Sequence, residues 1–154
     1  MKYWIFLLFI LDSTKISLKP IESSDLRFLY AHLNERDSRA NISHKRTPTY
    51  QEHVKFVLSK PYSKWYVVMY GTKKIGSIYL TKMNEIGIFI KKNFQDGGIG
   101  QTTLDLLMKK NPRDRFLANV NPKNKKSIDF FKHNKFKLIQ YTYEFINSKE
   151  DKRI

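Results

Sequence analysis

The chain has 154 residues, of which 41% are hydrophobic, so it forms one ordinary domain with a single core. It contains no cysteine, which excludes disulfide scaffolds, thiolate nucleophiles and cysteine-based metal sites. Its 29 Lys and Arg residues exceed its 14 Asp and Glu residues, giving a formal net charge of +15. Such a surface suits nucleic acid, an anionic membrane or a small phosphorylated ligand, although the charges could serve solvation alone.

The first eleven residues form an apolar run interrupted only by Lys2. The run is shorter than a membrane-spanning helix, which needs about 20 residues, and no small-residue cleavage site follows it. We therefore interpret residues 1–14 as an apolar N-terminal extension, residues 15–146 as a single domain and residues 147–154 as a tail. We expect a cytoplasmic protein, with export as the alternative.

Hydrophobic periodicity predicts a mixture of strands and helices. Ser23 or Ser24 can cap the first helix, with Asp25 in its first turn, and the Thr49 and Glu52 pair has the spacing of a capping box. The three middle strands are joined by short turns, so they should be antiparallel neighbours. The predicted elements are, in chain order, a strand over 16–20, helices over 24–33 and 50–58, strands over 65–70, 75–81 and 85–91, a helix from 101 to about 110, a strand over 116–120, a helix over 124–133 and a strand over 136–146.

The most informative segment runs from Glu85 to Met108 and joins a strand to a helix through a glycine-rich loop. Gly97, Gly98 and Gly100 permit a tight turn with converging backbone N–H groups, and the start of the following helix favours an anion. The sequence has no P-loop pattern, and the preceding strands are not the parallel strands that a Rossmann fingerprint requires. The loop predicts a pyrophosphate site of another kind, with a purely structural turn as the alternative.

At this junction the sequence resembles the GCN5-related N-acetyltransferase (GNAT) family, whose members carry Gln/Arg-x-x-Gly-x-Gly/Ala. Gln95, Gly98 and Gly100 match this pattern. The resemblance implies that backbone amides of the loop hold the pyrophosphate of acetyl-CoA, while the preceding strand pairs with its pantetheine arm. The residues to which the resemblance assigns cofactor binding are Ile88, Phe89, Ile90, Gln95, Asp96, Gly97, Gly98, Ile99, Gly100, Gln101, Asn124 and Phe131.

A second family segment, Asn-x-x-Ser/Ala followed by an aromatic helix and a closing Gly-Phe, is matched by Asn124, Ser127 and Phe136. Lys135 replaces the glycine, which affects a helix-end turn. Phe131 replaces a tyrosine that many relatives use as the general acid, so no acid is assigned. The resemblance covers nearly the whole predicted domain and implies an α/β fold of the mixed α+β kind. Its central sheet would be mostly antiparallel, splayed at the acyl-CoA site and flanked by about four helices.

One subgroup of the family acts on amino-sugar nucleotides, including the N-acetyltransferases of pseudaminic-acid-type biosynthesis. Its members carry Asn-Asp-x-x-x-Arg-x-Asn followed by Glu-Glu-His, and this sequence is similar to that pattern between Asn34 and His53. The resemblance implies that Asn34, Arg39, Asn41 and His53 bind the acceptor. Alternatively, Arg39 and Asn41 fix a long loop and His53 lies on a solvated helix face.

Glu85 is the candidate catalytic base, because related enzymes place a carboxylate at the start of this strand to accept the amine proton. An ordinary carboxylate at a strand end is the alternative. A backbone N–H within residues 88–90 is the candidate donor to the tetrahedral oxyanion. The four histidines lack the spacing of a metal site, so we expect no metal.

These interpretations combine into a hypothesis of an acetyl-CoA-dependent N-acetyltransferase that modifies a primary amine of a nucleotide-linked amino sugar. The alternatives are a protein or peptide N-terminal acetyltransferase of the ribosomal-protein type, and a non-catalytic basic binding module on the same fold. We expect acetyl-CoA as the acyl donor and a small-molecule amine as the partner. We expect neither nucleic acid nor a membrane span, and a monomer or homodimer.

Overall fold

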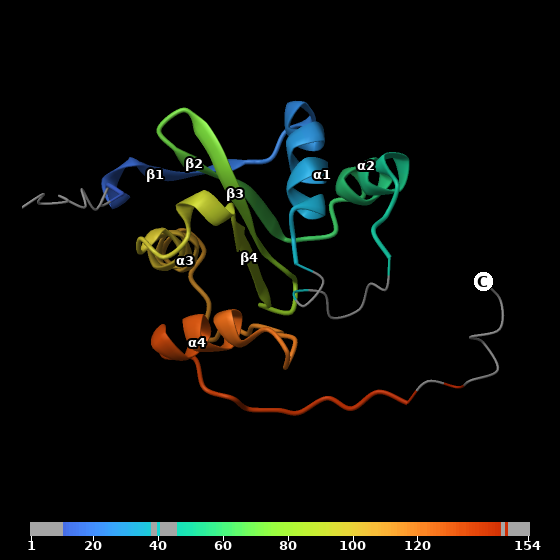
Figure 1. Cartoon of the computed structure of the whole chain (residues 1–154), viewed down its shortest axis with the longest axis vertical. Coiled ribbons are helices and arrows are strands. Elements are labelled where there is room, and N and C mark those ends of the chain that lie inside the picture. The colour runs from blue at the N-terminus through green and yellow to red at the C-terminus, as the bar shows by residue number, and fades with distance from the viewer. Residues whose placement is uncertain (1–10, 38–39, 41–45, 146, 148–154) are drawn as a thin grey trace, which may run out of the picture.

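The computed structural model describes residues 11–37, 40, 46–145 and 147, which form a sheet covered by helices on both faces (Figure 1). The strands β1 (Ile16–Pro20), β2 (Lys64–Tyr70), β3 (Lys73–Leu80) and β4 (Ile86–Ile90) lie in that order and pair antiparallel. The helices are α1 (Leu26–Asn34), α2 (Tyr50–Leu58), α3 (Ile99–Lys110) and α4 (Lys125–His133). The predicted mixed fold, with an antiparallel sheet and four helices, is confirmed.

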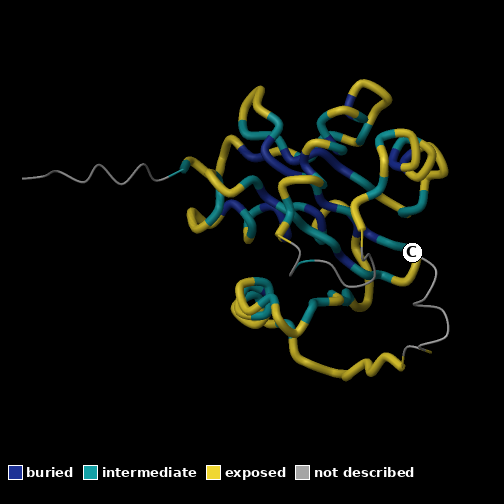
Figure 2. Tube along the Cα trace, turned by 45° about the vertical axis from the view of Figure 1, so that its right-hand side comes forward, coloured by how far each residue is buried: buried dark blue, intermediate teal, exposed yellow. Residues whose placement is uncertain are grey.

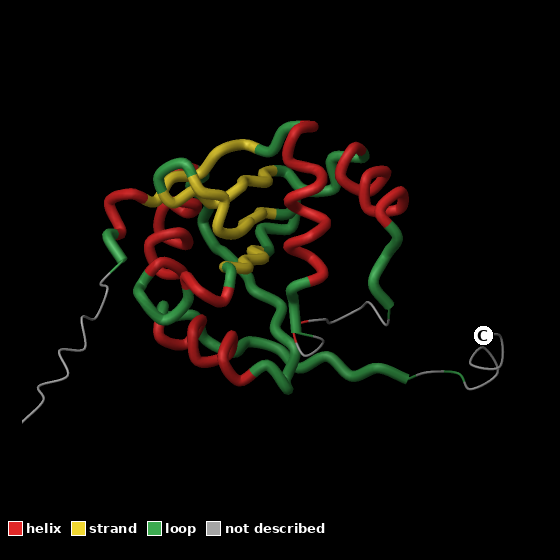
Figure 3. Tube along the Cα trace, turned by 45° about the horizontal axis from the view of Figure 1, so that its top comes forward, coloured by secondary structure: helices red, strands yellow, loops and turns green. Residues whose placement is uncertain are grey.

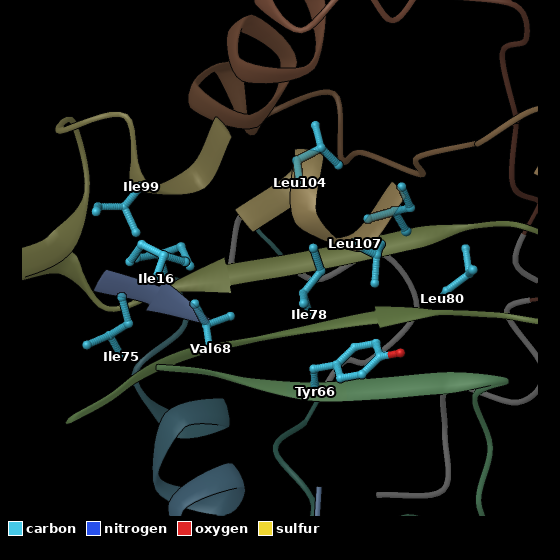
Figure 4. Close-up of a cluster of buried hydrophobic side chains, with 11 residues drawn as sticks. Ile16, Tyr66, Val68, Ile75, Ile78, Leu80, Ile99, Leu104 and Leu107 are labelled. Carbon is cyan, nitrogen blue, oxygen red and sulfur yellow. The ribbon is translucent and has the colours of Figure 1, made fainter. Parts of the chain in front are cut away.

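The two faces of the sheet have different coverings. α1 and α2 lie on one side and α3 on the other, with α4 beyond α3 (Figures 1 and 3). Side chains alternate along each strand, so every second residue faces α3. Figure 4 shows the resulting core, in which Ile99, Leu104 and Leu107 of α3 pack onto the sheet. The sheet residues of this core include Val68, Ile75, Ile78, Leu80, Ile86 and Ile90.

The two helices on the opposite face begin in different ways. α2 has the predicted capping box, because Thr49 Oγ1 accepts from the Glu52 N–H at 3.3 Å and Glu52 Oε2 accepts from the Thr49 N–H at 2.7 Å. The predicted serine cap of α1 is wrong, because a short 3-10 turn, Ser23–Asp25, precedes the helix. Asp25 is fully buried there and binds Lys74 Nζ at 2.7 Å, so it joins the start of α1 to β3.

Two predicted strands are not formed. In the segment 116–120, only Leu117 makes a bridge, which pairs it in parallel with Glu85 before β4 begins. The described part of the segment 136–146 forms no strand, and the side chains of Tyr143 and Phe145 are 90% and 91% exposed (Figure 2). Both predictions were wrong because a strand requires a partner along its length, and the described residues of neither segment have one. β4 diverges from residues 116–120 after a single bridge. Within the described ranges, no helix is both long and apolar enough to cross a membrane.

His32 packs α1 onto β4. Its ring is 2% exposed, stacks on Phe89 with centroids 4.3 Å apart, and its Nε2 lies 3.0 Å from the Phe89 carbonyl oxygen. Burial lowers the pKa of this imidazole below the usual 6.5, against smaller opposing effects of the Phe89 carbonyl and the Glu35 carboxylate. The contact therefore favours a neutral histidine that donates from Nε2.

The protein should lose stability in mild acid. As the pH falls below 6.5, the unfolded chain binds a proton at His32 before the folded chain does, so the free energy of unfolding decreases. In urea unfolding between pH 7 and pH 5, His32→Phe should show a shallower decrease than the wild type. His133→Phe changes an exposed histidine and should leave the slope unchanged. Equal slopes for all three proteins would contradict this account.

Leu104 is fully buried in the α3 core, whereas Leu58 of α2 is 62% exposed. We expect Leu104→Ala to lower the free energy of unfolding by about 2–5 kcal/mol, because it removes contacts and leaves a cavity. Leu58→Ala should lower it by less than about 0.5 kcal/mol. Chemical denaturation followed by circular dichroism measures both. Similar losses in the two variants would show that α3 is not the centre of the core.

Candidate functional site

In the described sheet, β4 is an edge strand with β3 on one side and no strand on the other. Lys91 donates its N–H to the Ile75 oxygen at 2.7 Å, and Thr81 donates to the Glu85 oxygen at 2.9 Å. Hydrogen-bonded pairs alternate in an antiparallel ladder, so the odd-numbered residues of β4 turn their backbone groups toward β3. The even-numbered residues Ile86, Ile88 and Ile90 turn theirs toward the open edge.

Both ends of this edge are hydrogen-bonded within the chain, whereas its middle, at Ile88, is available to a ligand. The Ile86 N–H donates to the Leu117 oxygen at 2.8 Å, and the Ile90 oxygen accepts from the Gln95 side chain at 2.6 Å. In the described part of the chain, neither backbone group of Ile88 has a partner. Phe89, one of the residues expected to pair with a ligand, instead turns its backbone toward β3 and stacks its ring on His32. The strand edge at Ile88 can therefore pair with an extended ligand.

The glycine-rich loop follows the same end of β4. Gly98 is the N-cap of α3 and has a φ of 77°, a conformation that glycine adopts without strain. The first helical hydrogen bond of α3 runs from the Thr102 N–H to the Gly98 oxygen. The N–H groups of Ile99, Gly100 and Gln101 precede it and have no helical partner. Together with the positive end of the helix, these donors fit a pyrophosphate.

A lysine from α4 lies across this loop. Lys126 Nζ is 2.7 Å from Gln95 Oε1 and 3.2 Å from Asp96 Oδ1. Asp96 has a φ of 64° and is the only carboxylate within the loop segment 95–100. The lysine offsets its negative charge at the point where an anion would bind. No local sequence signal predicts this pairing, because 30 positions separate Asp96 and Lys126.

α4 packs against the start of α3, next to the glycine-rich loop. Asn124 caps the helix by accepting from the Ser127 N–H at 3.1 Å, which agrees with the second sequence segment. The Phe130 ring would be 3.0 Å from a Cβ at Gly100, so this glycine allows α4 to approach α3 closely. Phe131 is 9% exposed and packs against the Phe130 and Phe136 rings. Lys135 has a φ of 67°, as a residue in place of a helix-ending glycine requires.

Glu85 lies where β4 meets Leu117. Its Oε1 accepts from Asn119 Nδ2 at 2.8 Å, and its Oε2 accepts from the Thr81 hydroxyl at 3.2 Å. The carboxylate is thus held beside the point at which β4 and the 116–120 segment separate. Asn119 was not predicted from the sequence, because only the bridge at Leu117 brings it to Glu85.

The predicted acceptor residues are not all gathered at this edge. His53 is 5% exposed and packs against the Tyr30 ring between α1 and α2, so the alternative of a solvated helix face is wrong. Burial lowers the pKa of its imidazole. Asn34 is exposed, and its side chain donates to the Tyr30 oxygen at 3.0 Å. Arg39 and Asn41 lie outside the described residues. Among the residues that are described, no cluster of His, Asp and Glu suits a metal ion.

Comparison with family models places residues 26–136 in the "Acetyltransferase (GNAT) family". No curated protein matches the chain in a sequence comparison. Among solved structures, a domain from Methanocaldococcus jannaschii has a TM-score of 0.74 and 24% identity, covering 84% of this chain and 93% of its own. Two further structures are similar at lower identity.

The first is RimL, a ribosomal L7/L12 α-N-protein acetyltransferase in complex with coenzyme A, with a TM-score of 0.69, 19% identity and 85% of each chain covered. The second is a chimera of the spermidine N-acetyltransferase SpeG from Vibrio cholerae and hSSAT, with a TM-score of 0.63 and 19% identity. It covers 77% of this chain and 78% of its own. These low identities establish the shared fold alone. The family model, in contrast, matches most of the chain, including the glycine loop and the open strand edge, and so establishes the family. The protein is therefore a member of the GNAT family of acetyltransferases.

Proposed function

We propose that this acetyltransferase transfers the acetyl group of acetyl-CoA to a primary amine of a nucleotide-linked amino sugar. The observation that carries the donor half is the unpaired edge of β4 at Ile88, which leads directly to the N–H groups at the start of α3. An extended amide chain can pair with the strand edge, and a pyrophosphate at the end of that chain then reaches the N–H groups at the start of α3. Acetyl-CoA has that composition, and it supplies an activated acetyl thioester.

The assignment of the acceptor is supported by the net charge of the chain. It is also supported by the similarity of the segment from residue 34 to residue 53 to the pattern of the amino-sugar-nucleotide subgroup. A net charge of +15 attracts anionic acceptors and repels polyamines. A nucleotide-linked sugar carries phosphates as well as an amine. N-terminal acetylation of a protein is the second candidate, favoured by the similarity to the RimL fold.

The residues of the open edge have distinct roles in this reaction. Glu85 takes a proton from the amine, directly or through water, so that the nitrogen lone pair can form the new C–N bond. The outward N–H of Ile88 donates to the oxyanion that develops on the acetyl carbon. As the C–S bond breaks, coenzyme A leaves as a thiolate, which water can protonate because thiol pKa values lie near 8.5.

Donor binding can be tested by calorimetric titration with acetyl-CoA, followed by turnover assays on a panel of amines. We expect saturable binding, and acetylation of nucleotide-linked amino sugars in preference to spermidine or N-terminal peptides. Release of the free thiol of coenzyme A reports turnover for every acceptor. Preferred acetylation of a peptide N-terminus would replace the amino-sugar proposal with the second candidate. Absence of acetyl-CoA binding would contradict the donor assignment.

Gly98 and Gly71 form a matched pair for testing the loop. Both have positive φ values, 77° and 58°, and a Cβ at either meets no atom within 4 Å. Gly98→Val and Gly71→Val should each strain the backbone by about 1–2 kcal/mol. Only Gly98→Val should weaken acetyl-CoA binding, by about tenfold or more, because it distorts the donors at the start of α3. Normal acetyl-CoA binding by folded Gly98→Val would place the pyrophosphate elsewhere.

Glu85→Gln tests the catalytic base. The amide keeps an oxygen acceptor for Asn119 but cannot take the amine proton, so kcat should fall about a hundredfold or more while the acetyl-CoA dissociation constant stays unchanged. Glu144→Gln alters an exposed carboxylate and should retain wild-type kcat. Steady-state rates across a pH series measure both variants. A Glu85→Gln enzyme with unchanged kcat would show that another group accepts the proton.

A further inference from the structure

The α1 face of the sheet carries a positive side chain that the donor site does not use. Arg36 follows α1, and its N–H donates to the Leu33 oxygen at 3.2 Å. Its guanidinium carbon lies 5.8 Å from the centroid of the Phe89 ring. The Nε atom of Arg36 is buried and has no hydrogen-bond partner. An unpartnered buried donor on a cation is costly, so this position favours an acceptor group that comes from a ligand.

Two phenols lie on the same face as Arg36. The Tyr62 and Tyr79 rings are stacked, with centroids 3.8 Å apart and planes at 3°. The Tyr79 ring covers Gly87, where a Cβ would overlap it. Burial and the Tyr79 phenol raise the pKa of Tyr62, while the nearby charge of Arg36 opposes that rise. The Tyr62 hydroxyl therefore stays protonated and interacts with the Tyr79 phenol, so the stacked pair is a neutral, polar neighbour of the guanidinium.

The carboxylate of Glu35 is directed to another cation. Glu35, the neighbour of Arg36, has its carboxylate 3.8 Å from Lys91 Nζ. No ion pair between Arg36 and a carboxylate is found within the described part of the chain. A cation with no counter-ion among the described residues, next to two neutral phenols, is suited to an oxyanion.

This group of residues lies beside the reacting edge. Gly87 and Phe89 flank Ile88 in β4. Because side chains alternate along a strand, both positions are on the α1 face, and the Phe89 side chain projects there. The opposite face is filled by the α3 core. An amine that approaches the edge at Ile88 must therefore come from the α1 side, past the Phe89 ring, the Tyr79 ring and Arg36.

We propose that Arg36, beside the stacked Tyr62 and Tyr79 phenols, binds a phosphate group of the acceptor and thereby selects anionic amines over polyamines. This inference rests on the proposed acetyl transfer to a nucleotide-linked amine and assigns the residue that recognises the acceptor. A competing location is the cavity of about 350 Å³ between α1 and α2, which is lined by Arg27, Tyr30 and Tyr50. That cavity also offers an arginine and two phenols, so the test must separate the two places.

The test is calorimetric titration of UDP into the full-length protein saturated with coenzyme A, which occupies the pyrophosphate loop. Arg36→Met should weaken UDP binding by about tenfold or more, because a charge-assisted hydrogen bond is lost. Arg36→Lys should retain part of the affinity, since it keeps the charge but not the planar fork. Arg27→Met, and Lys109→Met on the exposed side of α3, should bind UDP as the wild type does. Excess spermidine should not compete.

The outcomes separate this inference from the proposed function. Wild-type UDP affinity in folded Arg36→Met would overturn the inference, and a loss confined to Arg27→Met would place the phosphate in the α1/α2 cavity instead. Circular dichroism and unchanged coenzyme A binding establish that each variant is folded. If the wild type failed to bind coenzyme A, the proposed transferase reaction would fail. The same UDP titrations without coenzyme A would still decide the role of Arg36.

Discussion

The separation of β4 from the 116–120 segment is the constraint on which the rest of the molecule depends. After one parallel bridge at Glu85 and Leu117, the two segments part, and the outward backbone groups of Ile88 have no hydrogen-bond partner among the described residues. Every other feature of the site is arranged around this gap. Glu85 and its partner Asn119 lie at one end of the gap. The glycine loop and the start of α3 lie at the other end, and α1 covers one face of β4 beside it.

Charge is distributed unevenly around that gap. At the loop end, Lys126 is already engaged by Gln95 and Asp96, so an incoming anion meets the backbone donors of α3 next to a neutralised carboxylate. At the α1 end, Arg36 has no internal counter-ion in the described residues and lies against an aromatic ring. The two ends of the gap therefore differ in charge: a neutralised lysine lies at the loop end and an arginine without a described counter-ion at the α1 end.

Local signals predicted the parts of the structure that depend on neighbours in sequence. The capping box at Thr49 and the tight turn at the glycine loop were predicted, because each is set by residues within a few positions. The prediction of a strand over 136–146 was wrong because its alternating pattern is typical of a half-buried surface, and no described element pairs with residues 136–145. Arg36 could not be identified from the sequence, because its surroundings come from β4 and from the segment before β2.

If acetyl-CoA binds at the open edge of β4, as proposed above, the stability of the folded protein depends on its own substrate. A ligand that binds only the folded chain adds its binding free energy to the free energy of unfolding, by about 2.7 kcal/mol at a concentration one hundred times its dissociation constant. A donor bound along the edge at Ile88 would supply hydrogen-bond partners that the described part of the chain does not provide. The abundance of this enzyme in a cell would then follow the supply of acetyl-CoA, because the unliganded form unfolds and is degraded more readily.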